Sequence, residues 1–383
     1  MDLLLTLFLC GDVMTGRGVD QAFAASVDPA LHEPYVKNAR RYLELAEQAS
    51  GPVVEEDDPL TPREVWGEAL GEIAERSPAA SVINLETAVT TSDDAWRGKG
   101  IHYRMHPDNV GVIELASGST EPRDNRGAPV AAVLSNNHVL DWGHDGLRET
   151  IETLAASSAV EAVGAGRDAE SAAAPVVMDA AGDRRIVVFG HAAKTSGVPA
   201  VWQARPDRPG VNLLPDYSDT TLDAVARHIQ NHTREGDLVV FSVHWGGNWG
   251  YDVPAAQRRF ARGLLDRAGV DLVHGHSAHH VKGLEVYRDG LILYGCGDLI
   301  TDYEGIGGHV RYRPELSLLY FPSLGAETGE LVSLELVPMR LHRMRLRRAD
   351  HDEATWLRDT LREQSGNVRV ELTDKHTLRV KWD

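Results

Sequence analysis

The chain has 383 residues, of which 42% are hydrophobic and 25% are charged, a composition that is typical of a folded globular protein and excludes a disordered or fibrous one. Its formal net charge is −18, from 39 Lys and Arg against 57 Asp and Glu. This charge would repel the phosphates of a nucleic acid and the surface of an anionic membrane, so we expect neither as a partner.

The N-terminal segment MDLLLTLFLCGDVMTGR has an apolar run without a positively charged leader or a small-residue cleavage site, so it predicts a buried strand over residues 3–10 and not a signal peptide. No later segment approaches the roughly 18 consecutive apolar residues of a membrane span. The two cysteines, Cys10 and Cys296, fall at predicted strand ends. A disulfide between them is geometrically conceivable, but free thiols in a cytoplasmic protein are the preferred interpretation because cytosolic disulfides are rare.

Residues 21–76 are polar and interrupted by prolines, with helical spacing over 36–49 and 63–73, and we expect them to form an insertion that acts as a lid. Beyond them, strands alternate with helices. Strands are predicted over 80–85, 130–134, 160–165, 185–189, 238–243, 272–273, 291–294, 316–322 and 331–341, and helices over 139–156, 221–232, 254–268 and 353–364, before a C-terminal hairpin. This order predicts an α/β protein with a mostly parallel sheet and a few antiparallel strands late in the chain.

Polar residues with ligand chemistry follow many of these strands. They are Asp12, Glu86, Asn137, His138, His244, His274, His276 and Asp298, with His279 close behind. The carboxyl ends of neighbouring strands in an open sheet form one rim, so these side chains are expected to face a common cleft. Carboxylate, carboxamide and imidazole groups bind Mg, Ca, Mn, Fe or Zn. Any one of these residues alone is as well explained by a helix cap, a turn or a structural histidine; their repetition at strand ends predicts a metal site.

The strings GDVMTGR, INLETAVT, LSNNHVLDWGHDGL, VGAGRDAESA, FSVHWGGNWGY, HGHSAHH and YGCGDLITDYEG, in this order, resemble the CapA family of poly-γ-glutamate capsule synthesis, which is related to the calcineurin-like metallophosphoesterases. The resemblance runs from the first strand to about Leu341. It implies a four-layer α/β/β/α sandwich over residues 1–341, with a metal centre at the strand ends and the C-terminal helix and tail of residues 342–383 packed on the same domain.

Carried over to this chain, the resemblance implies metal ligands at Asp12, Glu86, Asn137, His244 and His276, with His138 in the general-acid position. Two positions depart from the phosphoesterase pattern. Met14 stands where a histidine is usual, and Ala278 stands where the late motif has its second histidine, with His279 one place further on. Both departures weaken one of two metal positions and leave acid–base groups in excess.

Those groups lead to the main functional hypothesis, a metal-dependent peptide epimerase that moves protons with His/Asp pairs. The CapA family includes a lasso-peptide epimerase that inverts the Cα of a C-terminal tryptophan around a calcium ion, and this chain is similar to such an enzyme. The hypothesis implies a peptide substrate and a divalent metal, with Ca²⁺ favoured over Mn²⁺, Mg²⁺ or Zn²⁺. The expected catalytic residues are Asp12, His138, Asp141, His276, His279 and Asp298.

Arg17, Trp245 and Trp249 are expected to bind the substrate, although the tryptophans are explained equally well by core packing. Two alternatives to the epimerase remain. One is a metallophosphoesterase or an enzyme of poly-γ-glutamate capsule synthesis, and the other is a binding module that has kept the fold without turnover.

Overall fold

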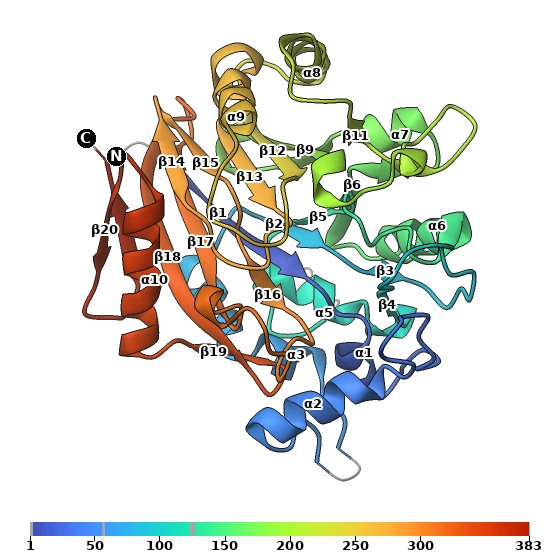
Figure 1. Cartoon of the computed structure of the whole chain (residues 1–383). Helices are drawn as coiled ribbons and strands as arrows, with labels where there is room; N and C mark the ends of the chain where they lie inside the picture. The colour runs from blue at the N-terminus through green and yellow to red at the C-terminus, as the bar shows by residue number, and fades with distance from the viewer. Residues whose placement is uncertain (1–2, 56–57, 123–126, 383) are drawn as a thin grey trace.

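The computed structural model describes residues 3–55, 58–122 and 127–382, which form two mixed β-sheets surrounded by helices (Figure 1). The ten-stranded sheet has the order β20-β21-β18-β17-β1-β2-β5-β6, with β16 beside β1 and β19 beside β18. Its strands are β1 (Leu4–Val13), β2 (Ala80–Leu85), β5 (Val130–Val133), β6 (Val160–Val163), β16 (Asp298–Ile300), β17 (Leu316–Gly325), β18 (Leu331–His342), β19 (Arg345–Arg348), β20 (Arg369–Leu372) and β21 (Leu378–Lys381).

The seven-stranded sheet has the order β11-β9-β12-β13-β15-β14, with β8 beside β9. Its strands are β8 (Val176–Asp179), β9 (Arg185–Ala193), β11 (Leu213–Leu214), β12 (Leu238–His244), β13 (Leu272–His276), β14 (Leu284–Tyr287) and β15 (Gly290–Leu293). Two small pairs complete the strands: β3 (Ala88–Val89) with β4 (Arg104–Met105), and β7 (Ala165–Gly166) with β10 (Gly210–Val211).

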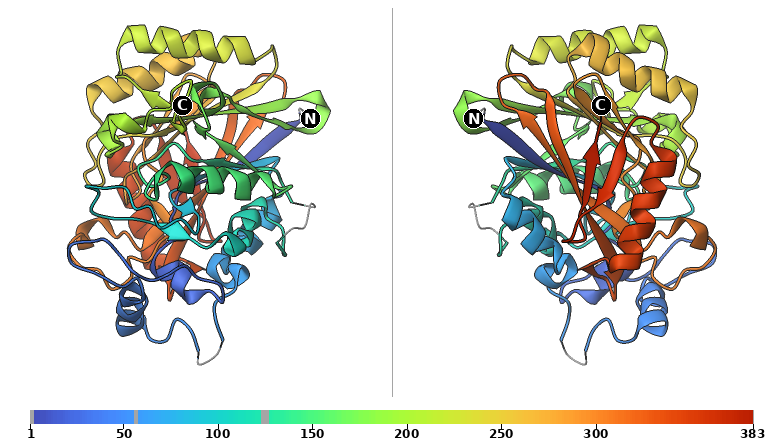
Figure 2. Two further views of the ribbon diagram at one scale, coloured as in Figure 1. Left: turned by 90° about the vertical axis from the view of Figure 1, so that its right-hand side faces the viewer. Right: turned by 90° about the vertical axis from the view of Figure 1, so that its left-hand side faces the viewer.

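The two sheets share one apolar core. Leu7 and Val82 of the ten-stranded sheet belong to the same buried cluster as Val188 and Leu272 of the seven-stranded sheet. Helices cover the outer faces, and Figure 2 shows α8 and α9 on one side and the blue N-terminal helices on the other. The helices are α1 (Gly18–Ala22), α2 (Arg40–Ser50), α3 (Pro62–Trp66), α4 (Ala69–Arg76), α5 (Gly111–Glu114), α6 (Gly143–Ala155), α7 (Ala169–Ala173), α8 (Asp219–His232), α9 (Ala255–Ala268) and α10 (His351–Gln364).

Several helix ends are encoded by local sequence. Thr61 and Glu64 form a capping box at α3, where Pro62 needs no hydrogen-bond partner for its nitrogen. Asp350 and Glu353 form the same motif at α10. At its C-terminus, α9 ends in Gly269, whose positive φ of 69° is readily adopted by glycine.

The predicted α/β class is confirmed, and the parallel and late antiparallel strands are both present. The alternation of strands and helices suggested one mostly parallel sheet, whereas the strands divide between two mixed sheets, as the family resemblance implied. The predicted helix over 63–73 is also interrupted: Gly67 separates α3 from α4 with a φ of 48°, and a Cβ at this position would lie 2.3 Å from the carbonyl oxygen of Leu346.

The C-terminal segment lies against the same core. β21 pairs with β18, and Leu357 and Leu361 of α10 join the apolar cluster between the sheets. In the proposed insertion, Trp66 and Ile73 are fully buried under the ten-stranded sheet, which anchors α3 and α4. Residues 56–57 of that insertion lie outside the described part, and its role as a lid stays a prediction.

Cys10 and Cys296 are both buried free thiols. Cys10 packs with the cluster on the helix-covered face of the ten-stranded sheet, whereas Cys296 belongs to the cluster between the sheets. Within the described ranges, no helix combines the length and the apolar character that crossing a membrane requires.

Candidate metal centre

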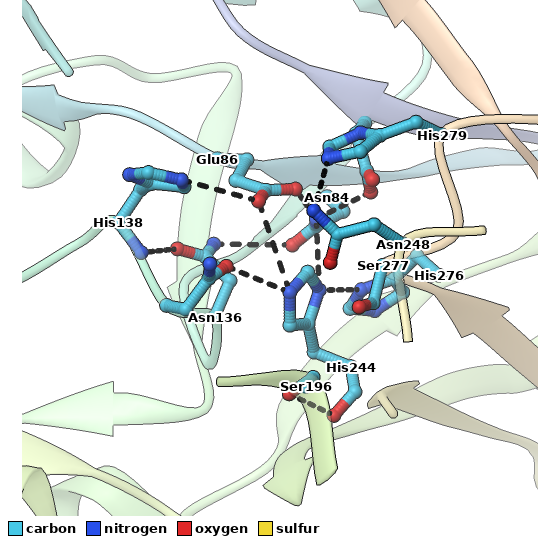
Figure 3. Close-up of polar contacts among 12 residues, drawn as sticks. Asn84, Glu86, Asn136, His138, Ser196, His244, Asn248, His276, Ser277 and His279 are labelled. Atoms are coloured by element: carbon cyan, nitrogen blue, oxygen red, sulfur yellow. Dashed lines mark hydrogen bonds and ion pairs between the residues drawn. The ribbon is translucent and has the colours of Figure 1, made fainter. Parts of the chain in front are cut away.

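The polar rim lies where strands of both sheets end (Figure 3). Asp12 in β1 is the register partner of Asp298 in β16, and His244 in β12 is the register partner of His276 in β13. Gly11 permits the first pairing, because a Cβ there would lie 1.7 Å from the carbonyl oxygen of Gly297. Residues from the two sheets therefore meet at one place.

Two groups of buried side chains have the geometry of metal ligands. Asp12, His244 and His276 form one group, and Asp12, His279 and Asp298 form the other. In each group the ligand atoms lie within 4.8 Å of one another. Asp12 belongs to both, so its carboxylate would be a ligand in either group.

A chain of hydrogen bonds orients the His276 ring. The Nε2–H of His274 donates to the carbonyl oxygen of Cys10 at 2.7 Å, which leaves its Nδ1 to accept from the Ser242 hydroxyl at 3.0 Å. Ser242 Oγ then accepts from the Nε2–H of His276, also at 3.0 Å. These partners assign a lone pair to Nδ1 of His276.

The same reasoning applies to His244. Its Nε2–H donates to Asn137 Oδ1 at 2.9 Å, so its Nδ1 also carries a lone pair and lies 2.8 Å from Nδ1 of His276. Burial lowers the pKa of both histidines well below the usual value, which keeps the rings neutral. Two lone pairs at this separation repel each other, and a cation bound by both nitrogens removes that repulsion.

The buried carboxylates of the site also indicate a bound cation. Asp12 Oδ2 and Asp298 Oδ2 are buried and have no hydrogen-bond partner within the described ranges. Burial, together with the neighbouring Asp298, raises the pKa of Asp12 to about 7. Burial and Asp12 raise the pKa of Glu86 well above its usual value. Clustered buried carboxylates are costly without a compensating charge, so the residues present fit a divalent cation.

Two histidines flank the ligand groups, and each is bonded to an aspartate. Nδ1 of His138 lies 2.6 Å from Asp141 Oδ2, and Nδ1 of His279 lies 2.8 Å from Asp298 Oδ1. We call these pairs the His138 dyad and the His279 dyad.

The two dyads differ in their electrostatics. Lys99 Nζ lies 2.5 Å from Asp141 Oδ1, and burial together with this ammonium group lowers the pKa of His138 to about 4. Burial also acts to lower the pKa of His279, but Asp298 outweighs it and the pKa is raised. Near neutral pH, His138 is therefore a neutral base, whereas the pKa of His279 is shifted in the opposite direction. Two histidines whose pKa values are shifted in opposite directions suit acid–base chemistry.

The sequence matches the family model described as "Bacterial capsule synthesis protein PGA_cap" over residues 6–303. This chain belongs to that family. A "Probable polyglutamine synthesis accessory protein" of Mycobacterium tuberculosis is 42% identical over 359 residues, covering 94% of this chain and 90% of the relative. The "PGA biosynthesis protein CapA" of Bacillus subtilis is 29% identical over 208 residues, covering 54% of this chain and 50% of the relative.

Membership of the CapA family agrees with the resemblance found from the sequence. The two mixed sheets and the buried His/Asp cluster are consistent with a metallophosphoesterase-like fold. None of these similarities supports the epimerase branch of the family.

Of the residues expected to hold the metal, some belong to the two ligand groups and others lie beside them. Asp12, His244 and His276 belong to those groups, whereas Asn137 contacts His244. Glu86 lies beside them, with Oε1 at 3.8 Å from Nε2 of His244.

The three residues expected to bind substrate have different surroundings. Arg17 is 3% exposed, and its donors are used by Asp302 and Glu33. Trp245 is 2% exposed and donates to the Tyr294 carbonyl oxygen at 3.0 Å, so the structure places both side chains in the framework, and substrate contact by either stays a prediction. Trp249 is half-buried, with its ring 5.6 Å from that of His279, and remains a candidate for substrate contact.

Three residues of the site were missed. Asn84 donates to Asp12 Oδ1 at 2.7 Å, and Asn136 donates to Asn84 Oδ1 at 3.1 Å, so a chain of amides links β1, β2 and the loop after β5. Asn84 lies two residues before Glu86, on the same side of its strand, and that spacing was a usable signal. Lys99 comes from an irregular loop that carries no comparable signal.

Proposed function

We propose that this chain is a metal-dependent accessory enzyme of glutamate- or glutamine-polymer synthesis that acts on the amide bonds of the polymer. The observation that carries the proposal is the pair of buried ligand groups sharing Asp12, flanked by the two dyads. The extensive similarity to the mycobacterial accessory protein supports the polymer as substrate. The proposal includes the four-layer α/β/β/α sandwich of the calcineurin-like superfamily, supported by helices on the outer faces of the two sheets.

The residues that would hold the metal are Asp12, His244 and His276 in one group and Asp12, His279 and Asp298 in the other. Imidazole nitrogens suit Mn²⁺, Fe²⁺ or Zn²⁺ better than Ca²⁺ or Mg²⁺, which prefer oxygen ligands alone. A bound divalent cation polarises a carbonyl oxygen and lowers the pKa of water.

The chain itself supplies the proton transfers. Asp141 accepts from Nδ1–H of His138 and fixes the ring, so that Nε2 is the nitrogen that exchanges a proton with the substrate. His138 is 6% exposed, which limits its contact with bulk water. In this role, Nε2 first takes a proton from the water that attacks the carbonyl carbon and then gives that proton to the nitrogen that leaves when the amide bond breaks.

The test is processing of a defined polymer. Purified protein loaded with Mn²⁺ is incubated with poly-γ-glutamate or a polyglutamine peptide, and the chain-length distribution is followed by mass spectrometry. His138→Ala should reduce the rate by about 10²–10⁴-fold, whereas His351→Gln, on the exposed start of α10, should not. Unchanged polymer with every divalent metal tested would refute the proposal. Full activity of His138→Ala would contradict the catalytic role given to this residue.

A second candidate, a peptide epimerase, is favoured by one observation: two His/Asp dyads with opposite protonation tendencies flank the same ligand groups. Such a pair suits removal of a Cα proton by one dyad and delivery of a different proton to the opposite face by the other. Incubation in D₂O with a lasso-type precursor peptide would then place deuterium at one Cα without cleaving the chain. Hydrolysis of an aryl phosphate in place of both reactions would favour a phosphoesterase.

A further inference from the structure

Two tyrosines connect the dyads: Tyr103, outside the sequence motifs, and Tyr303, within the last of them. Tyr103 precedes β4 and packs edge-on against His138, with ring centroids 4.6 Å apart and an interplanar angle of 86°. Tyr303 follows β16 and packs in the same manner against His279, at 5.4 Å and 85°. The two hydroxyl oxygens lie 3.1 Å apart. Each dyad therefore has its own tyrosine, and the tyrosines meet through their hydroxyl groups.

The surroundings hold this pair in place. The Arg17 guanidinium carbon lies 4.3 Å from the centre of the Tyr103 ring and 5.8 Å from that of Tyr303. The backbone N–H of Tyr103 donates to Asp141 Oδ2 at 2.7 Å, which ties this tyrosine to the His138 dyad. Tyr103 is fully buried, whereas Tyr303 is only partly buried. Tyr103 is therefore the firmly held member of the pair, and Tyr303 is the more accessible one.

Counting the hydrogens leaves one donor for a ligand. Tyr103 O–H donates to the oxygen of Tyr303, which uses the hydrogen of Tyr103. Among the described residues, the Tyr303 hydroxyl has no hydrogen bond in which it is the donor. A phenol is protonated at neutral pH, so this O–H is an uncharged donor.

The charge behind the pair indicates what kind of oxygen would accept that hydrogen. Arg17 is paired with both Asp302 and Glu33, so its positive charge is more than balanced. An uncharged donor without a net positive charge behind it suits a neutral amide carbonyl better than a phosphate or a free carboxylate.

We propose that Tyr303, positioned by Tyr103, is a substrate-binding residue whose O–H donates to an amide carbonyl oxygen held between the two dyads. The identity of the substrate as a glutamate or glutamine polymer rests on the proposed function, but recognition of an amide carbonyl does not. No covalent step is involved.

The test uses the Mn²⁺-loaded full chain and, as a probe, acetyl-glutaminyl-glutamine amide, which has amide carbonyls and no carboxylate. Calorimetry measures its dissociation constant. Tyr303→Phe should weaken binding roughly three- to tenfold, the value of one hydrogen bond, and Tyr103→Phe should weaken it in the same direction. Tyr287→Phe removes a hydroxyl bonded to Asp266 at 3.2 Å on α9 and serves as the control, with no change expected.

Metal content and melting temperature are measured on the same samples, so that a structural defect would be visible. Wild-type affinity in Tyr303→Phe, or no binding of the probe by the wild-type protein, would overturn the inference. Polymer turnover is assayed separately: if the wild-type protein binds the probe but leaves the polymer intact, the proposed function fails while the role of Tyr303 stands.

Discussion

Replacing Arg17 with methionine should lower the free energy of unfolding by about 3–5 kcal/mol, the cost of removing one partner from a buried ion pair. The guanidinium donates to the two oxygens of Asp302 at 3.0 and 2.6 Å and to Glu33 at 2.8 Å. Methionine fills part of the volume but leaves two buried carboxylates without their cation. Asp302 keeps a hydrogen bond from Gly18 N–H at 2.9 Å, and Glu33 keeps one from the Tyr42 hydroxyl, which favours the lower end of the range.

Urea unfolding at pH 8, followed by tryptophan fluorescence with metal present, measures this loss. The matched control is Arg41→Met, because Arg41 pairs with Glu44 at 2.8 Å with side chains 48% and 56% exposed, and its loss should cost at most about 0.5 kcal/mol. The double variant Arg17→Met with Asp302→Asn should regain part of the stability, since one buried charge is removed. A loss below about 1 kcal/mol in Arg17→Met, or one equal to the control, would refute the assignment of Arg17 to the framework.

Three further predictions follow from the site and the core. Asp12→Asn should lower the metal content at both ligand groups and His279→Ala at only one, as measured by elemental analysis. Burial raises the pKa of Asp271 from 3.8 to about 7, so the stability that its protonated form contributes is present below about pH 4 and lost as the pH rises to about 7. Asp271→Asn should therefore be more stable than the wild type by about 1–3 kcal/mol at pH 8, and urea unfolding at pH 4, 6 and 8 should show this advantage shrinking towards pH 4. Trp245→Ala should cost about 3–5 kcal/mol in thermal or urea unfolding, whereas Trp249→Ala should mainly raise KM; the reverse pattern would contradict the placement of the two rings.

Strands with strong apolar runs were predictable from the sequence. The run over residues 80–85 corresponds to β2 at both ends, because every side chain in it is buried. The three-residue strand β16 was missed, since its pairing with β1 depends on residues far away in the sequence and not on a local pattern. The division into two sheets followed from the family resemblance and not from the strand pattern, because periodicity identifies a strand but not its neighbour.

The site was predictable in outline because parallel strands bring their carboxyl ends to one edge, which is how Asp12, His244 and His276 were found. The roles within the site were not. Asp298 contacts His279 and also belongs to a ligand group, and only coordinates reveal that double position. The sequence alone suggested that Arg17 was free to bind substrate. Its ion-pair partners Glu33 and Asp302 come from separate segments, so these contacts could not be predicted.

The pairing of β1 with β16 affects the moment at which the site can form during synthesis. Asp12 leaves the ribosome long before its register partner Asp298, which lies far along the sequence. The chain emerges from its N-terminal end, and contacts between distant segments form late in folding. Until residue 298 has emerged, the ligand group that contains Asp298 cannot assemble. A nascent chain that lacks this strand would therefore have to bury Asp12 without that partner, and we expect full metal capacity to be acquired only after residue 298 has emerged.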